Sequence, residues 1–139
     1  MSFKLSPILR AGLESAARAA AAHAYAPYSK FRVGAAVLMG SGKIYRGANV
    51  ENASYSLCYC AERTALVTAV AAGENKLQAV AVYTPTARPT SPCGACRQML
   101  SEFGPDALVI SVCDGSRRVE LSLAELLPES FGPKDLRRK

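Results

Sequence analysis

The chain has 139 residues, of which 50% are apolar and 20% are charged, and its formal net charge is +6. Its length and composition fit one soluble globular domain over residues 1–139. No apolar run approaches the ~20 residues of a membrane-spanning helix, and the first residues lack the apolar core of a secretion signal, so we expect a cytoplasmic protein without a membrane partner. The basic residues form no run with interleaved aromatics, which favours a solvated basic surface over a nucleic-acid partner.

The first part of the chain predicts a helix followed by a strand hairpin. Residues 6–24 are rich in Ala, with apolar residues at helical spacing, and Ser6 is placed to cap this helix. Residues 26–30 form a loop because Pro27 cannot continue the helix. The hairpin that follows has strands at 31–39 and 44–50, joined by a tight turn at 41–42.

The second part of the chain predicts helices that alternate with strands. Residues 60–72 have apolar residues at helical spacing, and Gly73 is placed as the C-terminal cap. Residues 85–92 are rich in Thr, Pro and Ser and predict a loop. The other predicted elements are a strand at 79–83, a helix at 94–103, a strand at 108–112 and a short helix at 123–127.

This order of elements, α-β-β-α-β-α-β-α, indicates an α/β fold. Helices and strands that alternate in this way form one sheet, here of four or more strands, with helices packed on its faces. The order also places two cysteine groups, at Cys60 and at 93–96, where helices begin. Free N–H groups and partial positive charge at a helix N-terminus favour a thiolate over a thiol.

Three cysteines and one glutamate give the strongest functional signal. They lie in two short stretches, Cys60-Ala61-Glu62 and Pro92-Cys93-Gly94-Ala95-Cys96. Three thiolates can hold a zinc ion and leave its fourth position for water, and a glutamate two residues after the first thiolate is placed to move that water's protons. This spacing is the signature of zinc nucleobase deaminases. The sequence therefore predicts Zn²⁺ on Cys60, Cys93 and Cys96, with Glu62 as the catalytic residue.

A different use of the cysteines stays open. If Cys58 were a fourth ligand, the zinc site would be closed and structural, as in a zinc-stabilised binding domain without enzymatic activity. Against this, the spacing from Cys58 to Cys60 is tighter than the usual C-x₂₋₄-C spacing of zinc sites. Five cysteines are an odd number, which argues against a disulfide framework, and we expect Cys58 and Cys113 to be buried free thiols.

Two arginines adjoin the predicted ligands, Arg63 after Glu62 and Arg97 after Cys96. Three thiolates leave a zinc centre with net negative charge, which is a poor start for acidifying a bound water. We predict that both arginines donate hydrogen bonds to the thiolates and so restore Lewis acidity. The alternative is that they are surface arginines in the first turns of two helices.

With these motifs in place, the chain closely resembles the small homotetrameric cytidine deaminases that act on free nucleosides. The resemblance runs from about residue 26 to residue 136. The stretches that carry it are PYSKFRVGAA at 27–36, NVENASY at 49–55, CAERTA at 60–65, PCGACRQ at 92–98 and LLPESFGP at 126–133.

The resemblance implies a fold and a reaction. The fold is a three-layer α/β/α arrangement with a mixed, about five-stranded sheet, so a further strand is expected near 119–121. The reaction is the hydrolytic deamination of cytidine and 2′-deoxycytidine to uridine and 2′-deoxyuridine plus ammonia, in pyrimidine salvage. One Zn²⁺ per subunit and a homotetramer with sites shared between subunits are also implied.

The resemblance further implies how the substrate is held within one subunit. Asn49 and Glu51 would hydrogen-bond the ribose 3′-hydroxyl, and a carboxylate there suits a neutral hydroxyl but would repel a phosphate. Phe31 would lie against the base. The Ala61 amide would bind the base carbonyl O2, and the carbonyl of Ser91 would face the amino group.

Two aromatic residues would act across subunit interfaces. Phe131 would stack on the base in the site of a neighbouring subunit, and Tyr55 would also contribute across an interface. Two positions depart from the family pattern: Cys58, where cysteine is not expected, and Tyr59, where a smaller aliphatic residue is more familiar.

Other aminohydrolases are the rival assignments. A cytosine editor acting on RNA or DNA should carry a basic, aromatic strand-binding groove. A deoxycytidylate deaminase should carry a phosphate clamp, and an antibiotic-inactivating aminohydrolase is a further alternative. The sequence shows neither the groove nor the clamp, and Glu51 favours a free nucleoside.

Overall fold

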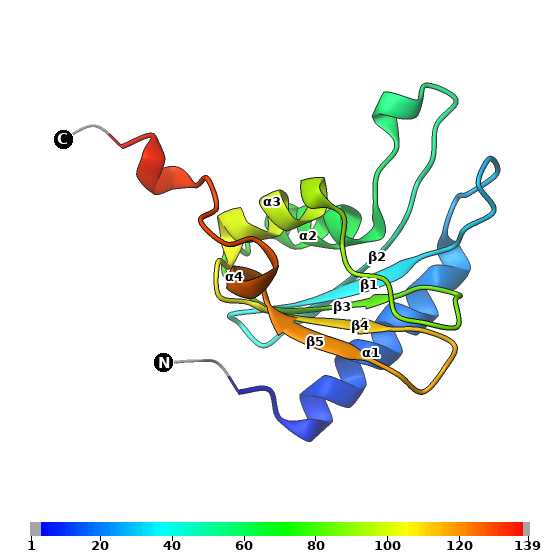
Figure 1. The fold of residues 1–139 in the computed structure, drawn as a ribbon, viewed down its shortest axis with the longest axis horizontal. Coiled ribbons are helices and arrows are strands. Elements are labelled where there is room, and N and C mark those ends of the chain that lie inside the picture. Colours follow the sequence, from blue (N-terminus) through cyan, green and yellow to red (C-terminus); the bar gives the residue numbers. More distant parts are fainter. Residues whose placement is uncertain (1–3, 138–139) are drawn as a thin grey trace.

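A five-stranded sheet between two layers of helices forms the body of the computed structural model, which describes residues 4–137 (Figure 1). The helices are α1 (Pro7–Ala20), α2 (Ala61–Ala71), α3 (Gly94–Phe103) and α4 (Leu123–Leu126). The strands are β1 (Gly34–Met39), β2 (Ile44–Ala48), β3 (Leu77–Tyr83), β4 (Leu108–Val112) and β5 (Val119–Ser122). Short 3₁₀ turns lie at Ala21–His23, Tyr55–Leu57 and Pro133–Asp135.

The sheet is mixed, with the strand order β2-β1-β3-β4-β5. β1 is antiparallel to both β2 and β3, β3 is parallel to β4, and β4 is antiparallel to β5. A parallel pair needs a crossover connection, and α3 supplies it between β3 and β4. Helix α1 covers one face of the sheet, and α2, α3 and α4 cover the other (Figure 1). The predicted three-layer fold is confirmed.

Strand β1 shows why both faces of the sheet are covered. Its residues alternate in direction: Ala35, Val37 and Met39 pack with α2 and α3, whereas Ala36 and Leu38 pack with α1. All six residues of β1 are buried, as expected for a strand with helices on both sides. The apolar content of the chain is therefore divided into two cores, one on each face of the sheet.

Helix α2 lies directly on strand β2, and a glycine permits this. A Cβ built on Gly47 would lie 2.3 Å from the backbone N of Ala65 and 2.8 Å from the carbonyl O of Ala61. Only hydrogen fits in this space, so the strand and the helix make backbone contact. This contact fixes the first turn of α2, which carries Glu62.

The ends of the predicted hairpin differ from the structure. The strand predicted at 31–39 begins only at Gly34, because the side chain of Asn49 takes the place of a strand partner there. Its Oδ1 accepts from the N–H of Val33 at 2.9 Å, and its Nδ2 donates to the carbonyl of Phe31 at 2.8 Å. The strand predicted at 44–50 ends at Ala48.

The other elements lie close to their predicted positions. Ser6 caps α1 as expected, since its Oγ accepts from the N–H of Leu9 at 3.2 Å, but the α-helix ends at Ala20 and continues as a 3₁₀ turn. Gly73 follows α2 with a φ of 98°. The fifth strand expected from the resemblance is present as β5. Within residues 4–137, no helix is both long enough and apolar enough to span a membrane.

Candidate zinc and substrate site

The thiols of Cys60, Cys93 and Cys96 form one cluster, with their sulfur atoms all within 4.8 Å of one another. The sulfurs of Cys60 and Cys93 are 4.0 Å apart, although the residues are 33 positions apart in the chain. Cys96 is buried, Cys60 is half-buried and Cys93 is exposed. The fold therefore brings together the three residues that the sequence predicted as zinc ligands.

The starts of α2 and α3 position these thiols. Cys60 is the N-terminal cap residue of α2, and Cys93 is that of α3. Both have extended backbone, and neither side chain caps its own helix, so both sulfurs are free to face the cluster. The unpaired N–H groups and partial positive charge at two helix N-termini stabilise negative charge on the sulfurs.

The electrostatics of the cluster suit a cation. Hydrogen bonding with Cys96 is the main cause that lowers the pKa of Cys60 to about 6, against the effect of burial, and Cys93 and Arg63 lower it further. The same contact with Cys60, together with burial, raises the pKa of Cys96. The cluster thus holds one negative charge readily and resists more. A soft divalent cation such as Zn²⁺ would remove this conflict, because it binds the deprotonated form of each thiol.

Arg63 provides a further sign that thiolates belong here. Its Nη2 donates to the carbonyl of Cys58 at 2.9 Å. Its Nε is buried and has no partner among the described residues. A buried donor without a partner is costly, and a guanidinium whose charge already acts on Cys60 is suited to an anionic sulfur acceptor. The residues present therefore fit zinc held by three thiolates.

The two predicted arginines are placed differently. Arg97 donates from Nε to the carbonyl of Pro92 at 2.8 Å and from Nη1 to the carbonyl of Leu126 at 2.9 Å. These bonds tie the loop before Cys93 to the end of α4. The predicted action of Arg97 on the thiolates stays a prediction, since its described hydrogen bonds go to carbonyl groups.

Glu62 lies in the first turn of α2 and is only 5% exposed. Burial raises the pKa of its carboxyl group to about 7. The negative charge of Cys60 raises this pKa as well, whereas a backbone N–H and the charge of Arg63 lower it. A carboxyl group in this range can both accept and release a proton near neutral pH, which suits general acid–base catalysis.

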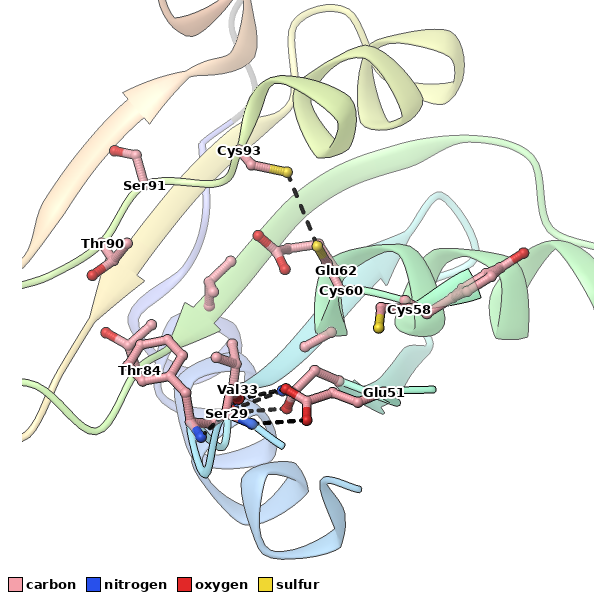
Figure 2. A pocket seen from close by; sticks show the side chains of 15 residues that line it. Ser29, Val33, Glu51, Cys58, Cys60, Glu62, Thr84, Thr90, Ser91 and Cys93 are labelled. Atoms are coloured by element: carbon pink, nitrogen blue, oxygen red, sulfur yellow. Dashed lines mark hydrogen bonds between the residues drawn. The ribbon is translucent and has the colours of Figure 1, made fainter. Parts of the chain in front are cut away.

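A cavity of about 340 Å³ lies beside the cluster and Glu62 (Figure 2). Its size is in the range of small-molecule sites, about 300–1,000 Å³. Eight of the predicted site residues line it: Phe31, Asn49, Glu51, Cys60, Ala61, Glu62, Ser91 and Cys93. The sequence did not predict its other lining residues: Ser29, Val33, Cys58, Tyr59, Val82, Thr84 and Thr90.

The side of the cavity away from the thiols is organised around Glu51 (Figure 2). Its Oε1 accepts from the backbone N–H groups of Tyr28 at 3.0 Å and Ser29 at 3.2 Å, and its Oε2 pairs with the hydroxyl of Ser29. The Ser29 hydroxyl is the main cause that lowers the pKa of Glu51. The carboxylate is therefore charged and fixed in place. Ser29 lies in the PYSKFRVGAA stretch, and that was the one available signal for its role.

Two of the predicted substrate-binding residues, Tyr55 and Phe131, are not part of the cavity lining. The side chain of Tyr55 is 75% exposed and that of Phe131 is 57% exposed. Phe131 is held at the backbone, where Gln98 Nε2 donates to its carbonyl at 2.8 Å. Neither side chain lines the cavity beside the thiols, and their action in a neighbouring subunit stays a prediction.

Comparison with known proteins places the chain in a family. Residues 11–112 match the family model described as the cytidine and deoxycytidylate deaminase zinc-binding region. A cytidine deaminase from Halalkalibacterium halodurans is 47% identical over 114 residues, which cover 81% of this chain and 86% of that protein. The chain belongs to the cytidine deaminase family.

Further cytidine deaminases agree with this assignment. The Mycobacterium tuberculosis protein is 42% identical over 127 residues, covering 91% of this chain and 92% of that protein. The crystal structure of cytidine deaminase from Burkholderia pseudomallei superposes with a TM-score of 0.84 at 48% identity, covering 87% of this chain and 98% of that one. A dCMP deaminase from a cyanophage, at 20% identity and a TM-score of 0.50, shares the fold alone.

The remaining cysteines bear on the closed-site alternative. In this member of the family, the sulfur of Cys58 accepts from the N–H of Asn52 at 3.3 Å and is not part of the thiol cluster. Cys58 is half-buried rather than buried as predicted, because it lies at the edge of the cavity. Cys113 is buried, as expected. The geometry therefore favours three ligands over four.

Proposed function

We propose that this chain is a zinc-dependent hydrolase that deaminates free cytidine and 2′-deoxycytidine to uridine and 2′-deoxyuridine, with release of ammonia, in pyrimidine salvage. The observation that carries the proposal is the buried Glu62 beside a three-thiol cluster, at one end of a cavity whose other end holds Glu51. Residues 1–139 act as one domain. A cytoplasmic location suits the proposal, because a reducing compartment keeps ligand thiols free of disulfides.

At the thiol end, Cys60, Cys93 and Cys96 hold the Zn²⁺ ion. Bound zinc supplies a Lewis acid that lowers the pKa of a coordinated water. Glu62 transfers both protons of the water in turn: it accepts the first as the oxygen adds to C4 of the cytosine ring and passes it to N3, and it then accepts the second from the new C4 hydroxyl and delivers it to the departing amino group. Its burial and its raised pKa allow both halves of this role.

At the sugar end, Glu51 and Asn49 bind the ribose 3′-hydroxyl. The carboxylate of Glu51 already accepts three hydrogen bonds and can accept another from a hydroxyl. Asn49 uses one donor and one acceptor on the backbone and keeps one of each kind for substrate. A fixed carboxylate at the 3′-hydroxyl repels a phosphate on that oxygen, which disfavours a nucleic-acid strand, and its charge also opposes the added negative charge of a nucleotide.

Between these two ends lies the base. Phe31, a lining residue that is 39% exposed, packs against the ring. The N–H of Ala61, at the first position of α2, has no partner within its helix and binds the carbonyl O2. The carbonyl of Ser91 faces the amino group. Arg63 offers its buried Nε–H to the thiolates, and Arg97 supports the same cluster by holding the Pro92 carbonyl.

The protein acts as a homotetramer with shared sites. Several large apolar and aromatic side chains are exposed in the single chain. Exposed apolar patches are typical of surfaces through which proteins associate. The exposed apolar residues include Tyr25, Val50, Tyr55, Leu57 and Phe131. Phe131 stacks on the base in a neighbouring subunit's site, and Tyr55 contributes across an interface. Hydrogen bonds from Gln98 and between Ser101 and Ser130 hold the Phe131 segment on α3.

The test is conversion of cytidine by purified, zinc-loaded protein, followed by the loss of cytosine absorbance. A matched Glu62→Gln variant with equal zinc content should fall in turnover by about 10²- to 10⁴-fold, the usual contribution of a general acid–base group. Failure to convert cytidine or deoxycytidine, with conversion of deoxycytidylate instead, would overturn the nucleoside assignment. Equal turnover by Glu62→Gln would overturn the role of Glu62.

A further inference from the structure

The ring of Tyr59 lies over the guanidinium of Arg63. The Cζ atom of Arg63 is 4.9 Å from the centre of the Tyr59 ring, which is the geometry of a cation–π interaction. Tyr59 directly precedes Cys60 in the chain. Its backbone is fixed by a pair of hydrogen bonds with Val50, at 2.8 Å from its N–H and 2.9 Å to its carbonyl. The ring is therefore presented from a rigid segment rather than from a free loop.

Arg63 needs such support because its position in α2 disfavours a positive charge. It is a cation in the first turn of α2, and a helix N-terminus disfavours positive charge. A long, charged side chain at this position would ordinarily extend its head group into water. Instead, the Arg63 Nε is buried without a partner among the described residues, and its Nη2 is bonded to the Cys58 carbonyl.

We propose that Tyr59 is a positioning residue that holds Arg63 against the cysteine cluster. Its ring covers one face of the guanidinium, and the Cys58 carbonyl takes one edge, so the Nε–H edge is left for the thiolates. A smaller aliphatic side chain has no negative π face and could not hold a cation in this way. The inference rests on the proposed role of Arg63 toward the thiolates.

The consequence is retention of zinc. Three thiolates give a centre with net negative charge, and a cation held beside them stabilises that charge against protonation and loss of the ion. Tyr59 also lines the substrate cavity, so contact with substrate is the competing explanation of its position. The two explanations differ in what a substitution changes: the rate of zinc release, or the KM for cytidine.

The experiment measures zinc release from the intact, zinc-loaded protein to an excess of a chromogenic chelator. Four variants are compared with the parent: Tyr59→Phe, Tyr59→Leu, Arg63→Gln and the double variant Tyr59→Leu/Arg63→Gln. The Leu variant should release zinc about three- to tenfold faster, the scale of one partly exposed cation–π contact. The Phe variant, which keeps the π face, should stay within about twofold of the parent.

The double variant tests whether Tyr59 acts through Arg63. We expect it to release zinc at the rate of Arg63→Gln alone, because effects of residues that act through one interaction do not add. KM for cytidine is measured for the zinc-loaded Leu variant as well, because a raised KM with unchanged zinc release would indicate contact with substrate instead. Circular dichroism and thermal melting of each variant check that the fold is kept; the 46% exposure of Tyr59 makes loss of packing small.

The outcomes separate the two ideas. If Arg63→Gln speeds zinc release and Tyr59→Leu does not, the positioning role of Tyr59 is wrong and the proposed role of Arg63 stands. If Arg63→Gln leaves zinc release unchanged, the positioning role of Tyr59 and the proposed role of Arg63 are both wrong. The proposed deamination reaction would still stand. Additive effects in the double variant, equal effects of Phe and Leu, or a raised KM with unchanged zinc release would each overturn the positioning role.

Discussion

The roles of some side chains in the cavity can be predicted from a sequence motif, whereas the roles of others depend on the conformation of a folded loop. The three thiol ligands and Glu62 were predicted from residue spacing alone. Their positions depend only on where two helices begin, and the sequence indicates those starts. The clamp on Glu51 was not predicted, because it depends on backbone N–H groups of Tyr28 and Ser29. These N–H groups point at the carboxylate only in a loop whose Lys30 has a φ of 61°, a conformation that no residue pattern specifies.

Replacing Glu51 by glutamine tests the sugar end without breaking the loop. The amide oxygen can still accept from the two backbone N–H groups, and its NH₂ can donate to the Ser29 hydroxyl. Loss of a charged acceptor should lower kcat/KM for cytidine by about 10- to 100-fold, from the ~1.5–3 kcal/mol of a hydrogen bond to a charged group.

A substrate without the 3′-hydroxyl provides the matching control. We expect the parent protein to lose a similar factor in kcat/KM with 3′-deoxycytidine, and the Glu51→Gln variant to lose little more with this substrate. Equal further loss in the variant would show that Glu51 and the 3′-hydroxyl do not interact. Melting temperatures of the two proteins should agree within a few degrees.

At the scale of helices and strands, the site depends on how closely α2 and α3 are seated on the sheet. The order of elements predicted that two helices would begin near each other, but the closeness of α2 to β2 could not be predicted from pattern. It arises at Gly47, and nothing in the sequence distinguishes this glycine from a glycine in any other strand. The fifth strand was likewise expected only from the resemblance, since Val119–Ser122 is short and at most half-buried.

Gly47→Ala should therefore loosen the helix that carries Glu62. The new Cβ would lie 2.3 Å from the Ala65 nitrogen, so β2 and α2 must separate. We expect a loss of at least ~1–3 kcal/mol in the free energy of unfolding, as for overpacked cores, together with lower kcat. Urea unfolding and cytidine turnover measure the two effects.

The control glycine is Gly12, on the exposed side of α1. A Cβ there would meet only the Ile44 side chain, at 3.9 Å. Gly12→Ala should stabilise the protein by roughly 0.5–1 kcal/mol, because alanine is the better helix former, and turnover should not change. If both alanine variants behaved alike, close backbone contact at Gly47 would not be what seats α2.

At the scale of the whole molecule, the proposed shared sites rest on aromatic side chains that are exposed in the single chain, such as those of Tyr55 and Phe131. Phe131 lies on the C-terminal segment, held on α3 by hydrogen bonds although its ring is 57% exposed. A segment fixed in this way presents its ring outward. No property of the isolated sequence distinguishes such a ring from one that packs in its own core, and only the resemblance suggested its role.

Mixed oligomers test the shared site. Phe131→Ala should lower activity roughly tenfold or more, since base–aromatic stacking contributes about 1–3 kcal/mol, and Glu62→Gln should be nearly inactive. Co-expressed, differently tagged subunits carrying one change each should form hybrids that are more active than either variant alone. An intact Phe131 from the Glu62→Gln subunit would then complete the site of its neighbour. Hybrids with only the average activity of the two variants would contradict sharing.

Zinc should also contribute to the stability of the whole fold. An ion that binds only the folded chain stabilises it by about 2.7 kcal/mol when free zinc is 100-fold above Kd. Under reducing conditions, a strong chelator should therefore lower the melting temperature, and added Zn²⁺ should restore it. A melting temperature indifferent to both would argue against a site built from the thiols of α2 and α3.

The 4.0 Å separation of the Cys60 and Cys93 sulfurs also affects how the protein responds to oxidation. Two thiols so close, one of them exposed, can be oxidised by dissolved oxygen to a disulfide when no metal ion is bound to them. The metal therefore serves as a protecting group for its own ligands. We expect protein stripped of zinc in air to lose the capacity to be reloaded, and to regain it only after a thiol reductant is added.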